Sequence, residues 1–393
     1  MKKFAFSILS LLALVLGCGC AGPSAEKRVD SLAADSDSIV EVAEAIHPDT
    51  ATLIFFGDAM QHRPQLNRAR MLGTPEEPYS FKGYYTLIEP AIRDADYAVV
   101  NLELPLAGGT DDYTGYPRFN APDAFAVELQ KAGFDLLLTS NNHSLDRNDR
   151  GVRRTLDVLD SLHIDHIGTY RDADERARLV PFIKEINGMK VGFLNYTYGT
   201  NGLKATQGAE VAYINRDKIR EEIEATRKAG AEIIVAMPHW GVEYVLSENE
   251  YQRSLADFML KEGVDIIIGG HPHVVQPMKV ITDKESGRRS LVVYSLGNFI
   301  SNMTKANTYG GAFVRVVIAR DPNTGKVSFK NADYDTFITR FPTNEKENWQ
   351  VVPRWHADRL PASQQKNWNQ HHSASSQLFD KENVDVPRST RSY

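Results

Sequence analysis

Short apolar runs alternate with segments of helical periodicity along most of the chain. The runs typical of strands are 52–56, 97–102, 135–139, 232–237, 266–268, 291–294 and 312–318. Helices are predicted at 84–93, 121–132, 150–162, 216–228 and 249–261. Strands that are nearly all apolar are typical of parallel sheets covered on both faces. The pattern therefore predicts a layered α/β domain over residues 51–340, with mostly parallel strands and helices on both faces.

Turn residues add two hairpins to this picture. Asn187-Gly188 separates the apolar runs 180–186 and 189–195, and a second turn is predicted at 321–325. Beyond Phe341 the chain is polar, and its Trp, Gln, Asn and His residues show no period. We therefore expect 341–393 to be a loosely packed or disordered C-terminal appendage.

The first residues have the pattern of an export signal. Lys2 and Lys3 precede an apolar stretch, 4–16, that is too short for an ordinary membrane-spanning helix. The sequence VLGC that ends at Cys18 resembles a bacterial lipobox, which predicts a signal peptide at 1–17 and a lipidated Cys18. Cys20 is a second candidate for lipidation, and an ordinary cleaved signal peptide is the alternative. Residues 18–50 then form a polar tether, in which 38–46 has the spacing of a short helix.

The composition limits the possible cellular location of the protein and its possible binding partners. Both cysteines lie in this leader, so the folded part has no thiol nucleophile or thiolate metal ligand. The net charge is −6, and no basic run is interleaved with aromatics, which argues against a nucleic-acid partner. We expect a membrane-anchored lipoprotein of the bacterial cell envelope. The outer membrane is favoured, because Gly19 is not the aspartate associated with inner-membrane retention.

Polar residues of metal-ligand type follow five of the predicted strands. In chain order they are Asp58, Glu103, Asn142 with His143, His239, and His271 with His273. In open α/β sheets, ligands bind beyond the carboxyl ends of the strands. Carboxylates and imidazoles without thiolates suit one or two divalent ions such as Mn, Fe or Zn. A central carboxylate can bridge two ions held ~3.5–4 Å apart and clamp a phosphoryl group between them.

The last of these motifs is Gly269-Gly270-His271-Pro272-His273. Proline favours an extended conformation at the residue before it. Because residues i and i+2 of an extended segment point the same way, both imidazoles are expected to face one centre. The alternative is a loop with two incidental histidines.

Taken together, these motifs resemble a known family. They are Gly57-Asp58-Ala59-Met60, Asn101-Leu102-Glu103, Asn141-Asn142-His143-Ser144-Leu145-Asp146, His239-Trp240-Gly241-Val242-Glu243-Tyr244, Gly270-His271-Pro272-His273-Val274-Val275-Gln276-Pro277 and Ser295-Leu296-Gly297-Asn298-Phe299. The set resembles the bacterial CapA family, which is tied to poly-γ-glutamate capsule synthesis. The domain of that family is similar to calcineurin-like metallophosphoesterases. The resemblance covers about residues 53–317.

The resemblance implies a role for each motif. Asp58 would hold one ion together with His273, and Glu103 would bridge two ions. Asn142, His239 and His271 would complete the second site. His143 would be the imidazole that protonates or polarises the leaving oxygen, and Asp146 would orient it.

Two departures from the metallophosphoesterase pattern affect the first site. The usual Asp-x-His is Asp58-Ala59-Met60 here, and the bridging aspartate is replaced by Glu103. A one-metal site, or a site kept only for binding, is therefore an open alternative.

Further residues near these motifs are candidates for substrate binding. Trp240 and Tyr244 form an aromatic wall or pack in the core, and Glu243 faces the substrate or supports the ligands. Asn298 hydrogen-bonds across the cleft or forms a structural turn. His62 and Arg63 meet an anionic substrate or are solvated loop residues. We treat the remaining histidines as surface or turn residues; they are His47, His163, His166, His356, His371 and His372.

Three functions are compatible with these residues. The first is a lipid-anchored CapA-type protein of poly-γ-glutamate synthesis or export with metal-dependent, phosphoesterase-like hydrolytic chemistry. The second is a non-catalytic component that binds the anionic polymer and assists a membrane-bound polymer synthase. The third is an envelope phosphodiesterase or nucleotidase unrelated to capsule.

Overall fold

The computed structural model describes residues 49–109 and 112–393. The predictions on the signal peptide, Cys18, Cys20 and the short helix at 38–46 lie outside these residues. Within the described ranges, no helix is long and apolar enough to cross a membrane.

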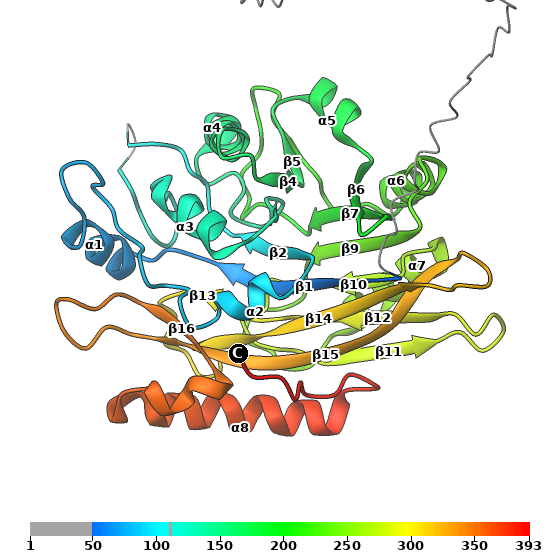
Figure 1. Ribbon diagram of the computed structural model, residues 1–393. Helices are drawn as coiled ribbons and strands as arrows, with labels where there is room; N and C mark the ends of the chain where they lie inside the picture. The colour runs from blue at the N-terminus through cyan, green and yellow to red at the C-terminus, as the bar shows by residue number, and fades with distance from the viewer. Residues whose placement is uncertain (1–48, 110–111) are drawn as a thin grey trace, which may run out of the picture. The chain divides into compact units, whose positions relative to one another are not determined.

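Two mixed sheets form the centre of the fold (Figure 1). The strand order of the first sheet is β16 (Gln350–Pro353), β15 (Val327–Arg340), β14 (Gly310–Arg320), β1 (Thr50–Ala59), β2 (Tyr97–Leu102), β3 (Leu136–Leu138) and β4 (Asp165–Ile167), and β13 (Asn298–Ile300) pairs with β1. The order of the second sheet is β11 (Met278–Thr282), β12 (Arg289–Val293), β10 (Ile266–Ile268), β9 (Ile233–His239), β7 (Met189–Thr197) and β6 (Phe182–Ile186). A small sheet joins β5 (Thr169–Tyr170) to β8 (Glu210–Val211).

The strand pairing confirms the predicted fold class. Strands β1 to β4 run parallel in the first sheet, as do β7, β9, β10 and β12 in the second. Both predicted hairpins are present, as β6–β7 and β14–β15. The pattern did not predict that the strands divide between two sheets.

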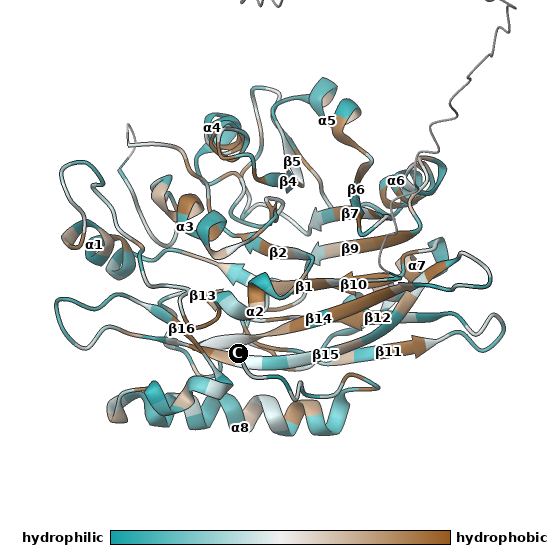
Figure 2. Cartoon of the chain, viewed as in Figure 1, coloured by the Kyte–Doolittle hydropathy of each residue, from teal (hydrophilic) through white to brown (hydrophobic). Residues whose placement is uncertain are grey.

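The two sheets pack face to face, with helices on their outer faces. Leu53 and Phe55 of β1 face the core between the sheets, whereas Ile54 and Phe56 face the helical side. The helices on that side include α1 (Arg63–Met71), α2 (Glu89–Arg93), α3 (Ala124–Ala132) and α4 (Asn148–Ser161). On the second sheet, Ile267 packs against α6 (Arg216–Lys228) and α7 (Glu250–Glu262). Figure 2 shows the resulting contrast between brown strands and largely teal outer helices.

Some helix boundaries differ from the expectation. The helix predicted at 84–93 begins only at Glu89, and Pro90 lies in its first turn, where its missing N–H costs no helical hydrogen bond. Besides α8, described below, two helices were not predicted, α1 and α5 (Ala173–Leu179). The α5 helix begins after Asp172, whose side chain accepts a hydrogen bond from the Glu175 N–H.

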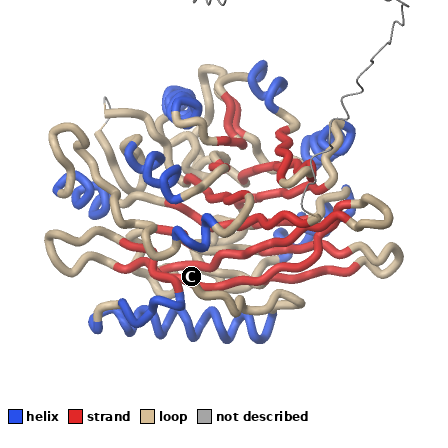
Figure 3. The backbone as a smooth tube through the Cα atoms, viewed as in Figure 1, coloured by secondary structure: helices blue, strands red, loops and turns tan. Residues whose placement is uncertain are grey.

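The prediction of a loosely packed C-terminal appendage is wrong. Residues 341–393 contain β16, two 3₁₀ turns (Arg354–Arg359 and Ala362–Gln364) and α8 (Gln365–Glu382), which runs beneath β15 and β11 (Figures 1 and 3). Trp368 and Phe379 of α8 are buried, and the Phe379 ring lies 4.5 Å from that of Tyr334 on β15. Apolar contacts spaced by helical turns hold the segment to both sheets.

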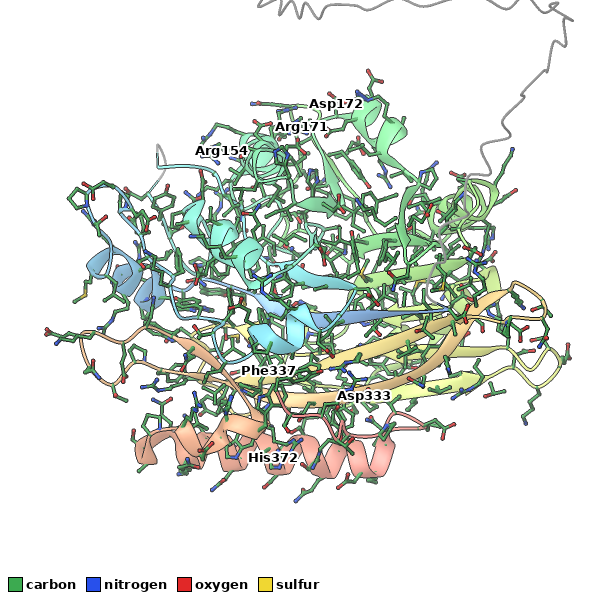
Figure 4. All side chains as sticks on the ribbon, in the orientation of Figure 1. Arg154, Arg171, Asp172, Asp333, Phe337 and His372 are labelled. Carbon is green, nitrogen blue, oxygen red and sulfur yellow. The ribbon has the colours of Figure 1, made fainter. Side chains whose placement is uncertain are left out.

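The chain after α8 also pairs with both sheets. Val384 exchanges backbone hydrogen bonds with Met278 and Val280 of β11. Four residues later, Arg388 bridges to Tyr334 of β15. His372, labelled in Figure 4, stacks on Trp368 on the same helix.

Candidate metal centre

The ends of five strands bring the predicted ligands together. Asp58 and His239 are the penultimate and last residues of β1 and β9, and Glu103 directly follows β2. The loops after β3 and β10 supply the others. Among these residues none is more than 4% exposed; they are Asp58, Glu103, Asn142, His143, His239, His271 and His273.

Two groups of side chains have ligand atoms within 4.8 Å of one another, and Glu103 belongs to both. In the first group, His273 Nδ1 lies 3.4 Å from Asp58 Oδ2 and His273 Nε2 lies 3.9 Å from Glu103 Oε1. In the second group, His239 Nε2 lies 3.6 Å from Glu103 Oε1, and its ring is 4.9 Å from that of His271. A carboxylate shared between two such groups is placed to bridge two ions.

Several polar atoms in the centre have no hydrogen-bond partner among the described residues. They include both carboxylate oxygens of Glu103 and Nδ1 of His271. Burying such groups unpaired is costly, and native proteins normally satisfy them. Oxygen and imidazole donors without partners are suitable ligands for a divalent cation, so the residues present fit a metal.

The electrostatics of the site support the same interpretation. Burial lowers the pKa of His239 to about 3 and that of His271 to about 2, so both rings are neutral and can donate a lone pair. Burial and the nearby charge of Asp58 raise the pKa of Glu103 well above its usual value. Burial alone would raise the pKa of Asp58, but contact with His273 and His239 lowers it below the usual range.

The two histidines around Pro272 converge, but not by the expected route. Their ring centroids are 6.0 Å apart, so both face the centre. His271 has a φ of 100° and His273 a φ of 58°, so neither residue is extended. Left-handed conformations are unfavourable for residues with a Cβ, and such strain is concentrated at functional sites.

His143 and Asp146 form a buried pair beside the ligands. His143 Nδ1 lies 2.7 Å from Asp146 Oδ2, which also accepts a hydrogen bond from the Phe119 N–H. The carboxylate therefore fixes the orientation of the imidazole and leaves Nε2 for another partner.

Asparagine side chains hold several of the ligands in place. Asn101 donates a 2.8 Å hydrogen bond to Asp58 Oδ1, and Asn142 Oδ1 lies 2.7 Å from His239 Nε2. Asn298 Oδ1 lies 3.0 Å from His273 Nδ1, and its amide nitrogen donates to the Thr308 carbonyl. Asn298 is fully buried and both ends of its amide are engaged, which favours the structural alternative, and its contact with substrate stays a prediction. Its position supports His273.

The predicted aromatic wall is only partly present. Trp240 has no exposed surface, packs among the residues between the second sheet and α7, and donates its indole N–H to the Tyr294 carbonyl. Its assignment to substrate binding is therefore wrong, because the side chain points into the core. Tyr244 and Glu243 are partly exposed, and the Tyr244 ring lies 6.2 Å from that of His273.

Three further residues lie near the centre. The role of His62 was left open by the sequence, and Phe119 and Tyr198 were not predicted as site residues. His62 packs edge-on against Phe119, which in turn contacts His143 with a centroid distance of 4.6 Å. Burial and then the charge of His273 lower the pKa of His62 to about 4. Tyr198 directly follows β7, and its ring lies 4.6 Å from that of His271. Tyr198 could have been predicted as a site residue, because it directly follows an apolar strand.

Met60, which stands where an imidazole was expected, is buried in the core beside α1. The first group therefore offers three ligand side chains, Asp58, Glu103 and His273.

The fold and the site define a layered α/β protein with a candidate divalent-metal centre at the strand ends. The profile of the family described as bacterial capsule synthesis protein PGA_cap matches residues 52–303. The chain belongs to this family, which confirms the resemblance to CapA.

Two curated relatives carry the CapA name. The capsule biosynthesis protein CapA of Bacillus anthracis is 26% identical over 293 residues, which cover 70% of this chain and 67% of the relative. The PGA biosynthesis protein CapA of Bacillus subtilis strain 168 is 26% identical over 283 residues, which cover 71% and 70%.

Solved structures show more distant similarity. The Haemophilus influenzae NAD nucleotidase NadN matches with a TM-score of 0.45 and 12% identity, over 86% of this chain and 64% of that one. The calcineurin-like phosphoesterase YfkN from Bacillus subtilis matches with a TM-score of 0.42 and 14% identity, over 84% and 99%.

Proposed function

We propose that this protein is a metal-dependent phosphoester hydrolase that acts in CapA-type capsule biosynthesis. The observation that carries the proposal is the buried Glu103, a residue that belongs to two ligand groups at once and whose carboxylate oxygens lack hydrogen-bond partners among the described residues. The adjacent His143–Asp146 pair supplies an oriented imidazole, which a metal-storage or purely structural site does not need.

The residues have distinct roles in this proposal. Asp58, Glu103 and His273 would hold one ion, and Glu103, His239 and His271 would hold the other. Asn142, whose Oδ1 lies 2.7 Å from His239 Nε2, would be a further ligand at the second site. Bound divalent ions polarise the phosphoryl oxygens and offset the charge that develops on them. Asp146 Oδ2, 2.7 Å from His143 Nδ1, orients the imidazole and leaves its Nε2 to pass a proton to the leaving oxygen.

Metal content and hydrolysis are measured first, on purified wild type and on an Asp58→Ala/His271→Ala double variant. We expect one or two tightly held ions in the wild type, none in the double variant, and hydrolysis of a phosphomonoester or phosphodiester panel. His163→Asn, which changes an exposed histidine outside the centre, is the control. A wild type without metal after Mn or Zn supplementation would contradict the proposal.

Met60 favours a second candidate, a non-catalytic protein that binds the anionic polymer, because the first ligand group lacks the usual imidazole. His143→Ala separates the two candidates in a strain that lacks this protein. A hydrolase variant would fail to restore the polymer, whereas a binding component would still restore it.

The envelope location is part of the proposal. We expect a lipid on Cys18, which anchors the domain to a membrane where it can meet a polymer synthase. Labelling cells with a radioactive fatty acid would mark the wild type and Cys20→Ser but not Cys18→Ser. Labelling lost in Cys20→Ser alone would move the anchor to that residue.

A further inference from the structure

Tyrosines from three separate segments lie near the buried centre. Tyr198 follows β7 and contacts His271, with a ring distance of 4.6 Å. Tyr244 lies in the loop after β9, 6.2 Å from the ring of His273. Tyr116, between β2 and α3, reaches His143 through Phe119, with ring distances of 6.5 and 4.6 Å. We call Tyr116, Tyr198 and Tyr244 the tyrosine mouth.

The tyrosine mouth is exposed although the ligands are not. Tyr116 is 76% exposed and Tyr198 is 46% exposed, whereas His271 and His273 are each 3% exposed. Tyr198, which has this much free surface and contacts a ligand histidine, is available to bind a molecule that approaches the centre.

The backbone holds Tyr244 in an unfavourable conformation. Its φ is 69°, in the left-handed region, and its N–H donates a 2.8 Å hydrogen bond to the Pro272 carbonyl. The Lys305 ammonium lies 3.6 Å from the centre of its ring. A strained residue kept in place beside a metal centre indicates a role for its side chain.

A carboxylate is the chain neighbour of one of these rings. Glu243 directly precedes Tyr244 in the loop after β9. Glu243 is partly exposed, so it is an acceptor for hydroxyl groups of a ligand at the mouth.

We propose that the tyrosine mouth binds the hydroxylated ring of a sugar phosphoester, with the ring stacked on Tyr198 or Tyr244 and its hydroxyls donating to Glu243. The proposal rests on the hydrolase function above and names its substrate class. Water adds to phosphorus, the bond between phosphorus and the sugar oxygen breaks, and that oxygen takes a proton, giving a sugar and phosphate. A linear polycarboxylate has no ring to stack on these side chains.

The test compares ring-bearing with acyclic phosphoesters on the metal-loaded full chain. Glucose 6-phosphate and AMP supply a hexose and a nucleoside ring, and glycerol 3-phosphate and O-phosphoserine are acyclic. Tyr198→Leu and Tyr244→Leu should lower kcat/KM about tenfold for at least one ring substrate, as expected for loss of one stacking contact. The acyclic substrates should change less than about twofold. Tyr251→Leu, an exposed tyrosine on α7, is the control.

A binding measurement keeps this test independent of turnover. Saturation-transfer NMR with glucose or adenosine should show contact with the wild type and Tyr251→Leu, and reduced contact with Tyr198→Leu. Ring contact without hydrolysis of any phosphoester would overturn the hydrolase function and leave the mouth as a sugar-binding site. Two results would contradict sugar binding at the tyrosine mouth but leave the hydrolase function intact. One is an equal loss of kcat/KM for ring and acyclic substrates in the tyrosine variants, and the other is hydrolysis without any NMR signal of ring contact.

Discussion

Two buried histidines in different regions show what separates a candidate ligand from a core residue. His271, in the candidate metal centre, is 3% exposed, and its Nδ1 has no hydrogen-bond partner among the described residues. His371, on α8, is 1% exposed, but its Nε2 lies 3.4 Å from the Gly311 carbonyl. Burial lowers the pKa of both, so burial alone does not mark a metal site.

The surroundings make the difference. His271 faces Glu103 and His239, both of which offer lone pairs in the same small space. His371 faces the Gly311 backbone carbonyl of the first sheet, which satisfies a neutral imidazole. Among the described residues it belongs to no group of metal-ligand side chains. A donor without a partner, next to other such donors, is therefore the more useful signal.

The largest expected effect is a loss of folding stability from a change in α8 that leaves metal binding unaffected. Phe379→Ala removes a buried aromatic side chain of α8 and should lower the free energy of unfolding by about 3–5 kcal/mol. Because Phe379 lies far from the ligands in the fold, metal content per folded molecule should not change. Urea unfolding and metal analysis on the same samples check this. A variant that loses metal while folded would show that the regions are coupled.

His271→Ala should weaken metal binding at the second group by more than about 100-fold, since it removes a ligand, not only a supporting residue. The first group should keep its ion, so a wild type that binds two ions should fall to one. Titration of metal-free protein measures this. His371→Ala is the matched control, and equal metal loss in both variants would contradict the distinction.

Asn298→Ala leaves the ligands in place but removes the side chain that orients His273. We expect about 10–100-fold weaker binding at the first group and unchanged binding at the second. Isothermal titration with Asn323→Ala, in an exposed hairpin turn, as control tests this. Unchanged metal affinity at both groups would mean that Asn298 only stabilises the loop that contains Thr308.

The smallest effect is the pH dependence that His371 contributes. Burial lowers its pKa from 6.5 to about 4, and the neighbouring His372 acts in the same direction. Because the unfolded chain binds the proton first, stability is full above pH 6.5 and is lost as the pH falls towards 4. Between pH 7 and 5 the wild type should lose about 1–2 kcal/mol more than His371→Gln. Parallel curves in urea unfolding at several pH values would argue against this.

The strand-end residues could be predicted because two simple rules fix them. A buried strand is an apolar run, and the carboxyl ends of parallel strands meet at one edge. The same rules do not predict which sheet a strand joins. Leu53 of the first sheet and Ile266 of the second are both apolar, so the pattern does not distinguish the two sheets. Trp240 was misassigned for a related reason: it follows a ligand, and its direction depends on backbone geometry that the spacing does not reveal.

The C-terminal helix was missed because its buried stripe is chemically mixed. Trp368, His371, Ser375 and Phe379 recur at helical spacing and all are buried. Two of the four are polar, so an apolar pattern does not emerge. The left-handed His271 and His273 were also unpredictable, since only tertiary contacts can hold such a conformation.

The segment after α8 has a further consequence through its pairing with β11 and β15. β11 ends the second sheet, and β16 covers only residues 337–340 of β15. Val384 and Arg388 occupy backbone positions on these two strands that another chain could otherwise use. The C-terminal residues thus cover edge positions of β11 and β15 and prevent strand-to-strand aggregation there. Removing 383–393 should therefore reduce solubility well before it reduces metal binding.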